Sequence, residues 1–251
     1  GLEHHMAYTI DLSGRVAIVT GGAKGIGRAI CCLLAEAGAD IVLDDIKDLE
    51  EVRPTLDRIE GLGRRALYVR ADVTVPADVD RMVQTALETF GHIDILVNNA
   101  GVNAEWERTL DVNARGPYLC AMAVLPHMVA RGSGHIVNIS STAALSGSTG
   151  YPAYVASKGA NMSLTRYLAR EYAPRGIHVN GIMPAVIKTD MLLARYGSEE
   201  ALLAHYVPRI PLRRVGEPED VARIVLFLCS ELSSYISGEI IVADGGRLWG
   251  T

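Results

Sequence analysis

The chain has 251 residues, 49% of them hydrophobic and 21% charged, with a formal net charge of −5 at pH 7. This length and hydrophobic content predict one substantial core and favour a single domain. The net negative charge gives no electrostatic reason to expect nucleic acid or an anionic membrane as a partner, and no apolar run is long enough to span a bilayer.

Residues 1–5 resemble the remnant of a purification tag, so the natural chain is expected to begin at Met6. The cysteines lack the paired spacing of a zinc site or a disulfide framework. Buried reduced thiols, a cytoplasmic location and no bound metal are therefore expected, the four thiols being Cys31, Cys32, Cys120 and Cys229.

The first predicted strand, Val16 to Thr20, runs into a glycine-rich turn and a helix that reaches Ala37. In this arrangement bare backbone can approach a pyrophosphate at the helix N-terminus. The glycines, Gly21, Gly25 and Gly27, do not have the best-known dinucleotide spacing, so a purely structural turn is the alternative.

The second predicted strand, Ala39 to Leu43, leads into two acids, Asp44 and Asp45. Asp45 lies where an acid can accept a hydrogen bond from an adenosine 2′-hydroxyl, and it would repel a 2′-phosphate. That favours NAD over NADP. Lys24 in the glycine turn argues for NADP, because a cation there can pair with a phosphate; a solvated turn residue is its simpler interpretation.

A helix through Leu56 precedes the third predicted strand, Ala66 to Arg70, which is followed by Asp72 and Val73. This pair could hydrogen-bond and pack against an adenine. A helix N-cap is the alternative role for Asp72. A helix from Pro76 to Phe90 and a fourth strand from Ile93 to Val97 come next, ending in Asn98-Asn99-Ala100-Gly101.

Tyr154 and Lys158 lie four residues apart in a predicted helix, so they project from the same face. A nearby cation favours phenolate over phenol, which would bring Tyr154 closer to proton exchange near neutral pH. The spacing by itself is weak, and a solvated pair on a helix surface is the alternative.

These motifs, in this order from about Leu12 to Gly246, resemble the short-chain dehydrogenase/reductase family. The resemblance implies an α/β fold, a Rossmann-type doubly wound three-layer sandwich with a central, mostly seven-stranded parallel sheet. It also implies that residues 6–251 form a single dinucleotide-binding catalytic domain, with a seventh strand from Glu239 to Ala243.

By the same resemblance, four side chains carry out catalysis: Asn113, Ser141, Tyr154 and Lys158. The implied reaction interconverts a secondary alcohol and a ketone with NAD(H), Tyr154 being the general acid and base. Ser141 would bind the substrate oxygen. Asn113 would order a water that links Lys158 to solvent.

The resemblance also implies a set of cofactor contacts. Pro184 to Thr189 matches the family's Pro-Gly loop, with Ala185 in place of the glycine, which would be strained if the position needed a positive φ. The expected contacts are Gly21, Lys24, Gly25, Ile26, Gly27, Asp45, Asp72, Val73, Asn99, Ala100, Gly101, Tyr154, Lys158, Pro184, Ile187 and Thr189.

Between Gly101 and Asn113 the chain is shorter than in most members of that family. Either a loop is deleted, or a mobile segment is missing from the sequence, which we favour because loops beside active sites are often mobile. An intact mass above 27.0 kDa would support the missing segment.

Residues 188–211 match a substrate lid, although packing against the body or a partner subunit is an equal alternative. Four further residues are expected to line the pocket and suggest a small, largely apolar ketone or secondary alcohol: Leu145, Ser148, Tyr151 and Val186. The resemblance favours a homotetramer built on the last strand and the two long helices.

Two other functions are possible on this sequence. One is an NADPH-dependent 3-oxoacyl-(acyl-carrier-protein) reductase, in which Arg131 and Arg175 would meet an acidic carrier protein. The other is a catalytically silent NAD-binding protein on the same fold. Cofactor binding without turnover would identify the latter.

Overall fold

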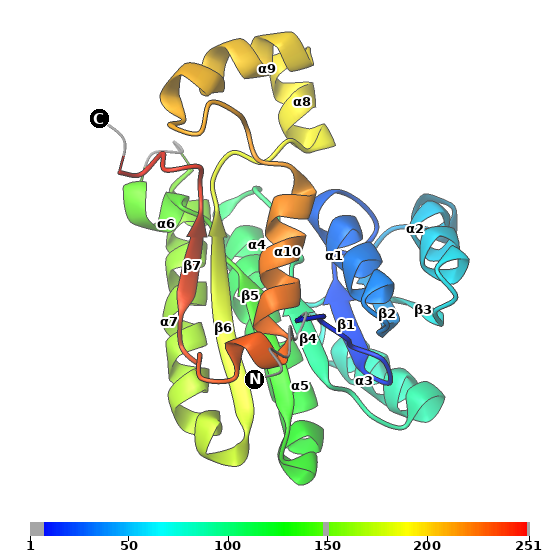
Figure 1. Ribbon diagram of the computed structural model, residues 1–251. Coiled ribbons are helices and arrows are strands. Elements are labelled where there is room, and N and C mark those ends of the chain that lie inside the picture. Colours follow the sequence, from blue (N-terminus) through cyan, green and yellow to red (C-terminus); the bar gives the residue numbers. More distant parts are fainter. Residues whose placement is uncertain (1–7, 148–150, 250–251) are drawn as a thin grey trace, which may run out of the picture.

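The computed structural model describes residues 8–147 and 151–249, and its centre is a sheet of seven parallel strands (Figure 1). The strands lie in the order β3-β2-β1-β4-β5-β6-β7. Their bounds are β1 Val16–Thr20, β2 Asp40–Asp45, β3 Ala66–Arg70, β4 Ile95–Asn98, β5 Gly134–Ile139, β6 Ile177–Pro184 and β7 Ile240–Ala243. The predicted seven-stranded parallel sheet is confirmed.

Helices cover both faces of this sheet and give the expected three layers (Figure 1). One face packs against α1 (Gly25–Glu36), α2 (Leu49–Gly61) and α10 (Pro218–Leu228). The other packs against α3 (Pro76–Phe90), α5 (Gly116–Arg131) and α7 (Pro152–Tyr172). The shorter elements are α4 (Trp106–Leu110), a π-helix over Asp111–Arg115, α6 (Ala143–Ser146), α8 (Asp190–Tyr196) and α9 (Glu199–Tyr206).

The strands are apolar along their whole length because the sheet is buried on both sides. Ala17 and Val19 of β1 belong to the core beneath α1 and α10, whereas Val16 and Ile18 belong to the core beneath α3 and α5. Alternate side chains of one strand thus fill two separate cores.

The strand order reverses between β1 and β4, which lie side by side. From this pair the sheet extends in opposite directions, through β2 and β3 on one side and through β5, β6 and β7 on the other. A crevice opens outside the carboxyl ends of the strands at such a point. The glycine turn after β1 and the Asn99-Ala100-Gly101 segment after β4 both lie there. The fold therefore gathers the sequence motifs at one edge of the sheet.

A chain of buried amides attaches α7 to the sheet. Asn98 Nδ2 donates to Asn138 Oδ1 at 2.8 Å, and Asn138 Nδ2 donates to Thr165 Oγ1 at 2.9 Å. Thr165 Oγ1 in turn donates to the carbonyl of Asn161 at 2.9 Å. Because unpaired polar groups are costly in a core, these bonds fix the position of α7, the helix that carries Tyr154, on β4 and β5.

Most predicted bounds agree with the structure, and the differences have simple causes. β2 continues through Asp44 and Asp45 because β3 pairs with it as far as Asp45. The expected tag remnant at residues 1–5 and the expected pocket residue Ser148 lie outside the described residues. Across residues 8–147 and 151–249, no helix combines the length and apolarity needed to cross a membrane.

Candidate active site

Two adjoining cavities open at the carboxyl edge of the sheet. One, of about 600 Å³, lies along the glycine turn and the ends of β2 and β3; the other, of about 430 Å³, lies over β5, α6 and the start of α7. They share five lining residues and therefore border one another: Ile26, Asn99, Gly101, Val102 and Thr189. We refer to them as the nucleotide cavity and the substrate cavity.

The glycine turn leaves the floor of the nucleotide cavity free of side chains. Gly25 has a φ of +57°, which an L side chain rarely adopts, and it borders this cavity at the start of α1. A Cβ on Gly27 would lie 2.0 Å from the carbonyl oxygen of Gly21, so α1 could not begin this close to the turn with a larger residue. The bare helix N-terminus fits a pyrophosphate.

Asn99 and Thr20 hold this turn against β4. Asn99 Nδ2 donates to the carbonyls of Thr20 and Gly21, each at 3.0 Å. Thr20 Oγ1 accepts from the backbone N–H groups of Asn99 at 3.1 Å and Ala100 at 3.0 Å. Asn99 therefore lines the cavity as expected, and its amide positions the turn.

Asp45 lies at the rim of the nucleotide cavity with its carboxylate fixed by the backbone. Its Oδ2 accepts from the N–H of Ala23 at 3.1 Å, and its Oδ1 accepts from the N–H of Lys47 at 3.2 Å. Lys24 also lines this cavity, but its ammonium lies 3.7 Å from Glu51, which is itself 3.4 Å from Lys47. The two lysines thus share one counter-ion.

Asp44 is a second acid of the nucleotide cavity that the sequence analysis did not assign to the site. It is 1% exposed, and its Oδ1 has no hydrogen-bond partner within the described chain. Burial, together with the charge of Asp45, raises the pKa of Asp44 well above its ordinary value. A polar residue within an apolar strand was the signal available in the sequence.

Asp72 and Val73 line the nucleotide cavity beside β3. Asp72 accepts from the Thr74 hydroxyl at 2.7 Å and from the Arg108 guanidinium at 3.0 Å. Burial raises its pKa, but these bonds outweigh burial and the net pKa is lowered. The alternative role as an N-cap is wrong, because Val75 is the N-cap of α3.

Tyr154 and Lys158 meet at the floor of the substrate cavity. The Lys158 ammonium lies 5.6 Å from the centroid of the Tyr154 ring and donates to the carbonyl of Ile139 at 2.9 Å. Lys158 is 4% exposed, and burial lowers its pKa to about 8. The helical spacing therefore does place both groups in one site.

The pKa of Tyr154 corrects one expectation. Burial raises it above the ordinary value, and a hydrogen bond with Ser141 acts in the opposite direction without cancelling the effect. The lowered pKa expected from Lys158 is therefore not found; the Lys158 ammonium donates to the carbonyl of Ile139.

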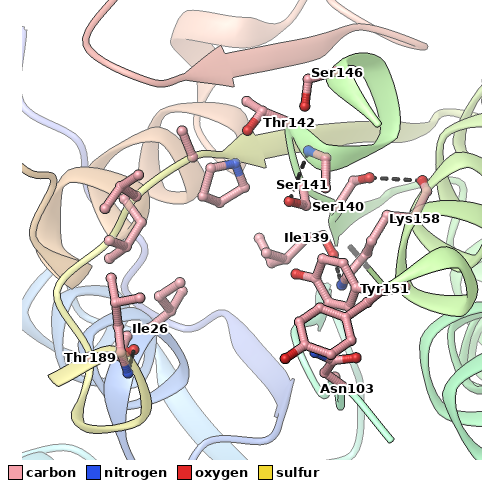
Figure 2. Close-up of a pocket in the computed structure, with 18 of the residues that line it drawn as sticks. Ile26, Asn103, Ile139, Ser140, Ser141, Thr142, Ser146, Tyr151, Lys158 and Thr189 are labelled. Carbon is pink, nitrogen blue, oxygen red and sulfur yellow. Dashed lines mark hydrogen bonds between the residues drawn. The ribbon is translucent and has the colours of Figure 1, made fainter. Parts of the chain in front are cut away.

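Ser141 follows β5 and lies on the same side of the cavity as Lys158 and Tyr151, opposite Ile26 and Thr189 (Figure 2). Its Oγ accepts from the N–H of Ala143 at 3.2 Å, which holds the hydroxyl at the start of α6. The neighbouring Ser140 instead donates to the Lys158 carbonyl at 2.8 Å. Ser140 is thus a positioning residue that the sequence analysis missed.

Asn113 lies in the π-helix and is fully buried. Its Oδ1 accepts from the N–H of Val102, and its Nδ2 donates to the carbonyl of Val102, both at 2.8 Å. Nδ2 also donates to Ser157 Oγ at 3.1 Å. Asn113 therefore fastens the short connection that follows Gly101 onto α7.

The short connection forms a closed, hydrogen-bonded loop. Thr109 Oγ1 donates to the carbonyl of Ala104 and accepts from the N–H of Ala104, both at 3.0 Å. These hydrogen bonds close the short connection without further residues, so a true deletion is compatible with the fold. The favoured alternative, a missing segment, stays a prediction for the intact mass.

The loop after β6 does not need a glycine. Among residues 8–147 and 151–249, Arg213 is the only residue other than glycine that has a positive φ. Ala185 is therefore in an ordinary backbone conformation and is unstrained. Its N–H donates to the carbonyl of Ala243 at 3.0 Å and extends the pairing with β7. Pro184, Ile187 and Thr189 all line the substrate cavity.

Of the expected pocket residues, Tyr151 and Val186 line the substrate cavity and Leu145 does not. Leu145 lies on the outer side of the short helix α6 and is 50% exposed, a direction that its sequence position could not reveal. The segment 188–211 contributes Leu192, Arg195 and Tyr206 to the cavity wall.

Comparisons with known proteins identify the family to which the chain belongs. A family model described as enoyl-(acyl carrier protein) reductase matches residues 21–247. A subunit, BbsD, of the hydroxy(phenyl)methylsuccinyl-CoA dehydrogenase of Thauera aromatica is 39% identical over 248 residues, covering 95% of this chain and 98% of that protein. The chain belongs to the short-chain dehydrogenase/reductase family.

Other members of the family are similar over the same length. The 3-oxoacyl-(acyl-carrier-protein) reductase FabG of Chlamydia pneumoniae is 38% identical, covering 94% of this chain and 98% of that protein. The crystal structure of a candidate short-chain alcohol dehydrogenase from Sinorhizobium meliloti superposes with a TM-score of 0.91 at 36% identity, covering 97% of this chain and all of that one. The protein is an oxidoreductase of a family that uses NAD(P).

Proposed function

We propose that the protein interconverts a secondary alcohol and a ketone with NAD(H), using residues 6–251 as one catalytic domain. The observation that carries this proposal is the position of Tyr154. Its phenol is hydrogen-bonded with Ser141 and stands next to Lys158, in a cavity that adjoins a nucleotide-sized one. A proton acceptor therefore lies beside the place where a hydride acceptor fits.

A bound nicotinamide would supply the hydride acceptor for the alcohol carbon and, in its reduced form, the hydride donor for the ketone carbon. Tyr154 takes the hydroxyl proton in oxidation and gives it back in reduction. Ser141 donates to the substrate oxygen, where negative charge develops. Since burial raises the pKa of Tyr154 in the chain alone, the positive charge of an oxidised nicotinamide, when bound, would favour the phenolate.

Lys158 can pass the proton on toward solvent, because its pKa of about 8 allows exchange near neutral pH. A Cβ on Gly101 would lie 3.4 Å from both Lys158 Nζ and Asn113 Oδ1. The absent side chain leaves a place where a water can contact both groups. Asn113 retains a lone pair on Oδ1 for that water, which supports its expected role.

NAD is the cofactor that the nucleotide cavity favours. Asp45 presents a fixed carboxylate at the cavity rim, suited to a ribose 2′-hydroxyl and repulsive to a 2′-phosphate. Lys24 and Lys47 share Glu51, so neither is an unpaired cation for such a phosphate. Ile187 is suited to contact the carboxamide of a nicotinamide. The hydrogen bonds on either side of it join Val186 and Lys188 to Gly216, and within the described chain they leave the backbone N–H and carbonyl of Ile187 free for that contact.

A second candidate is NADPH-dependent reduction of a 3-oxoacyl thioester, favoured by the similarity to FabG. The arginines expected to bind a carrier protein are only partly available for it. Arg131 pairs with Asp94 at 3.2 Å, and Arg175 lies over the ring of Tyr172. A catalytically silent nucleotide-binding protein is disfavoured by the assembled Ser141-Tyr154-Lys158 group.

We further infer a cytoplasmic homotetramer that contacts its copies through α5 and α7. Tyr118 and Met122 lie one turn apart on α5 and are 46% and 39% exposed, and Tyr167 of α7 is 62% exposed. Large apolar side chains gathered on helix surfaces are typical of interfaces. The segment 188–211 would close over the substrate as a lid.

The test is absorbance-monitored reduction of NAD⁺ and, separately, NADP⁺ with a panel of secondary alcohols. Turnover with NAD⁺ should fall by about 10²- to 10⁴-fold in Tyr154→Phe. The matched control is Tyr172→Phe at the far end of the same helix, which should retain activity. Preference for NADP⁺ would favour the thioester reductase, and nucleotide binding without turnover would refute the enzymatic proposal.

A further inference from the structure

The substrate cavity carries two arginines that the sequence analysis did not connect with it. Arg195 is in the last turn of α8, and Arg247 follows β7, more than fifty residues later in the chain. Both line the cavity that also contains Tyr154 and Ser141. Arg195 is exposed and Arg247 half-buried, so both stand where a substrate enters from solvent.

Neither guanidinium has a carboxylate within ion-pair distance among residues 8–147 and 151–249. The neighbouring cations of the same region do: Lys188 lies 2.7 Å from Glu217, and Arg214 lies 2.5 Å from Asp220. Asp244, the acid closest in sequence to Arg247, uses its two oxygens to accept from the N–H groups of Gly246 and Leu248. The cavity wall is therefore positively charged.

Tyr206 lines the same cavity as these two cations. The Arg247 guanidinium carbon is 5.6 Å from the centroid of the Tyr206 ring, and the Tyr206 hydroxyl is 2.9 Å from that of Tyr196. Burial and Tyr196 raise the pKa of Tyr206, whereas the charges of Arg247 and Arg195 act to lower it. Arg247 thus lies over Tyr206, on a support made by α8 and α9, and Arg195 lines the same cavity.

We propose that the substrate carries an oxyanion group, a carboxylate or a phosphate, that binds Arg195 and Arg247 while its alcohol or ketone carbon reaches Tyr154. Planar guanidinium groups pair with two oxygens of such anions at once, and the pairing is stronger where water is partly excluded. A neutral substrate would leave these two guanidiniums without a counter-charge, in a cavity whose other lining comprises Lys158, the amides of Asn99 and Asn103, and hydroxyl and apolar groups. This proposal differs from the small, largely apolar substrate that the sequence suggests.

This inference rests on the proposed function, and matched substrates test it. Levulinate is compared with methyl levulinate, and acetoacetyl-phosphopantetheine with acetoacetyl-pantetheine, so that each pair differs in its charged group. We expect kcat/KM to be at least about tenfold higher for the charged member of one pair, as a charge-assisted hydrogen bond provides. A preference in the first pair identifies a carboxylate, and one confined to the second identifies the phosphate of a thioester.

The double variant Arg195→Gln, Arg247→Gln should bring this ratio close to one. Arg209→Gln, an exposed arginine of the same region that does not line the cavity, should leave it unchanged. An equal rate for both members in the unaltered protein would overturn the inference, as would a preference that survives in the double variant.

A binding measurement separates this result from a failure of the proposed function. Thermal unfolding of the NADH-saturated Tyr154→Phe protein is followed with increasing levulinate, acetoacetyl-phosphopantetheine or the neutral counterpart of either. A charged probe that raises the Tm there, and no longer does so when Arg195→Gln and Arg247→Gln are added, supports the inference even without turnover. If no charged probe raises the Tm more than its neutral counterpart does, the inference is wrong whatever the activity.

Discussion

The buried positive charge of Lys158 destabilises the folded protein. Replacing Lys158 with an uncharged side chain should therefore make the fold more stable at neutral pH. Lys158 is 4% exposed, and burial lowers its pKa to about 8 from an ordinary 10.5. A pKa shift of that size means that the folded protein is destabilised by roughly 3 kcal/mol when the buried ammonium stays protonated. The hydrogen bond to Ile139 returns about 1 kcal/mol.

Lys158→Met should therefore raise the free energy of unfolding at pH 7 by about 2 kcal/mol while abolishing turnover. The sign follows from proton binding. Between about pH 8 and 10.5 the unfolded chain holds the Lys158 proton and the folded chain does not, so the unaltered protein gains stability as the pH rises through that window. The advantage of the variant should shrink there and vanish above it.

The assay is urea unfolding at pH 7 and pH 10, without cofactor. Lys24→Met serves as the control, because the Lys24 side chain is 56% exposed and its substitution should have a small, pH-independent effect. A Lys158→Met protein that is less stable at pH 7, or whose difference from the unaltered protein is the same at both pH values, would refute the argument that burial dominates this lysine.

Other predictions follow from the nucleotide cavity and the outer helices. Because burial raises the pKa of Asp44, the unaltered protein loses stability as the pH rises above the ordinary value of 3.8; Asp44→Asn should therefore increase the Tm more at pH 8 than at pH 4, and an equal shift would contradict a raised pKa. Asp45→Ala should lower the NAD⁺-to-NADP⁺ ratio of kcat/KM by about tenfold, measured at saturating alcohol, and an unchanged ratio would remove Asp45 from cofactor selection. Met122→Glu should reduce the mass measured by light scattering, and an unchanged mass would place the interface elsewhere.

The sequence by itself determined the order of strands and helices and predicted where the nucleotide cavity lies. β1, β3 and α3 have the predicted bounds because apolar periodicity, prolines and glycines are local signals. The glycine turn and the Tyr154–Lys158 spacing act within one element or one turn. Such motifs are predictable because the residues that make them are adjacent in the chain.

Contacts between distant elements could not be predicted in this way. The binding of Asn113 to the backbone of Val102, the direction of Leu145 and the buried Asp44 depend on how α7, α6 and β2 pack. The raised pKa of Tyr154 is of this kind, since helical spacing gives the distance to Lys158 but not the burial of either group. Periodicity specifies which face a residue occupies, and tertiary packing decides what that face meets.

Arg195 and Arg247 show the same division. In the sequence they are two unremarkable surface arginines, separated by α9, α10 and β7. The sheet brings the end of β7 beside the end of β6, and the segment after β6 then places Arg195 over the same cavity. The reaction class was readable from local motifs, whereas the charge of the substrate cavity was decided by the tertiary structure, because only folding brings those two side chains together.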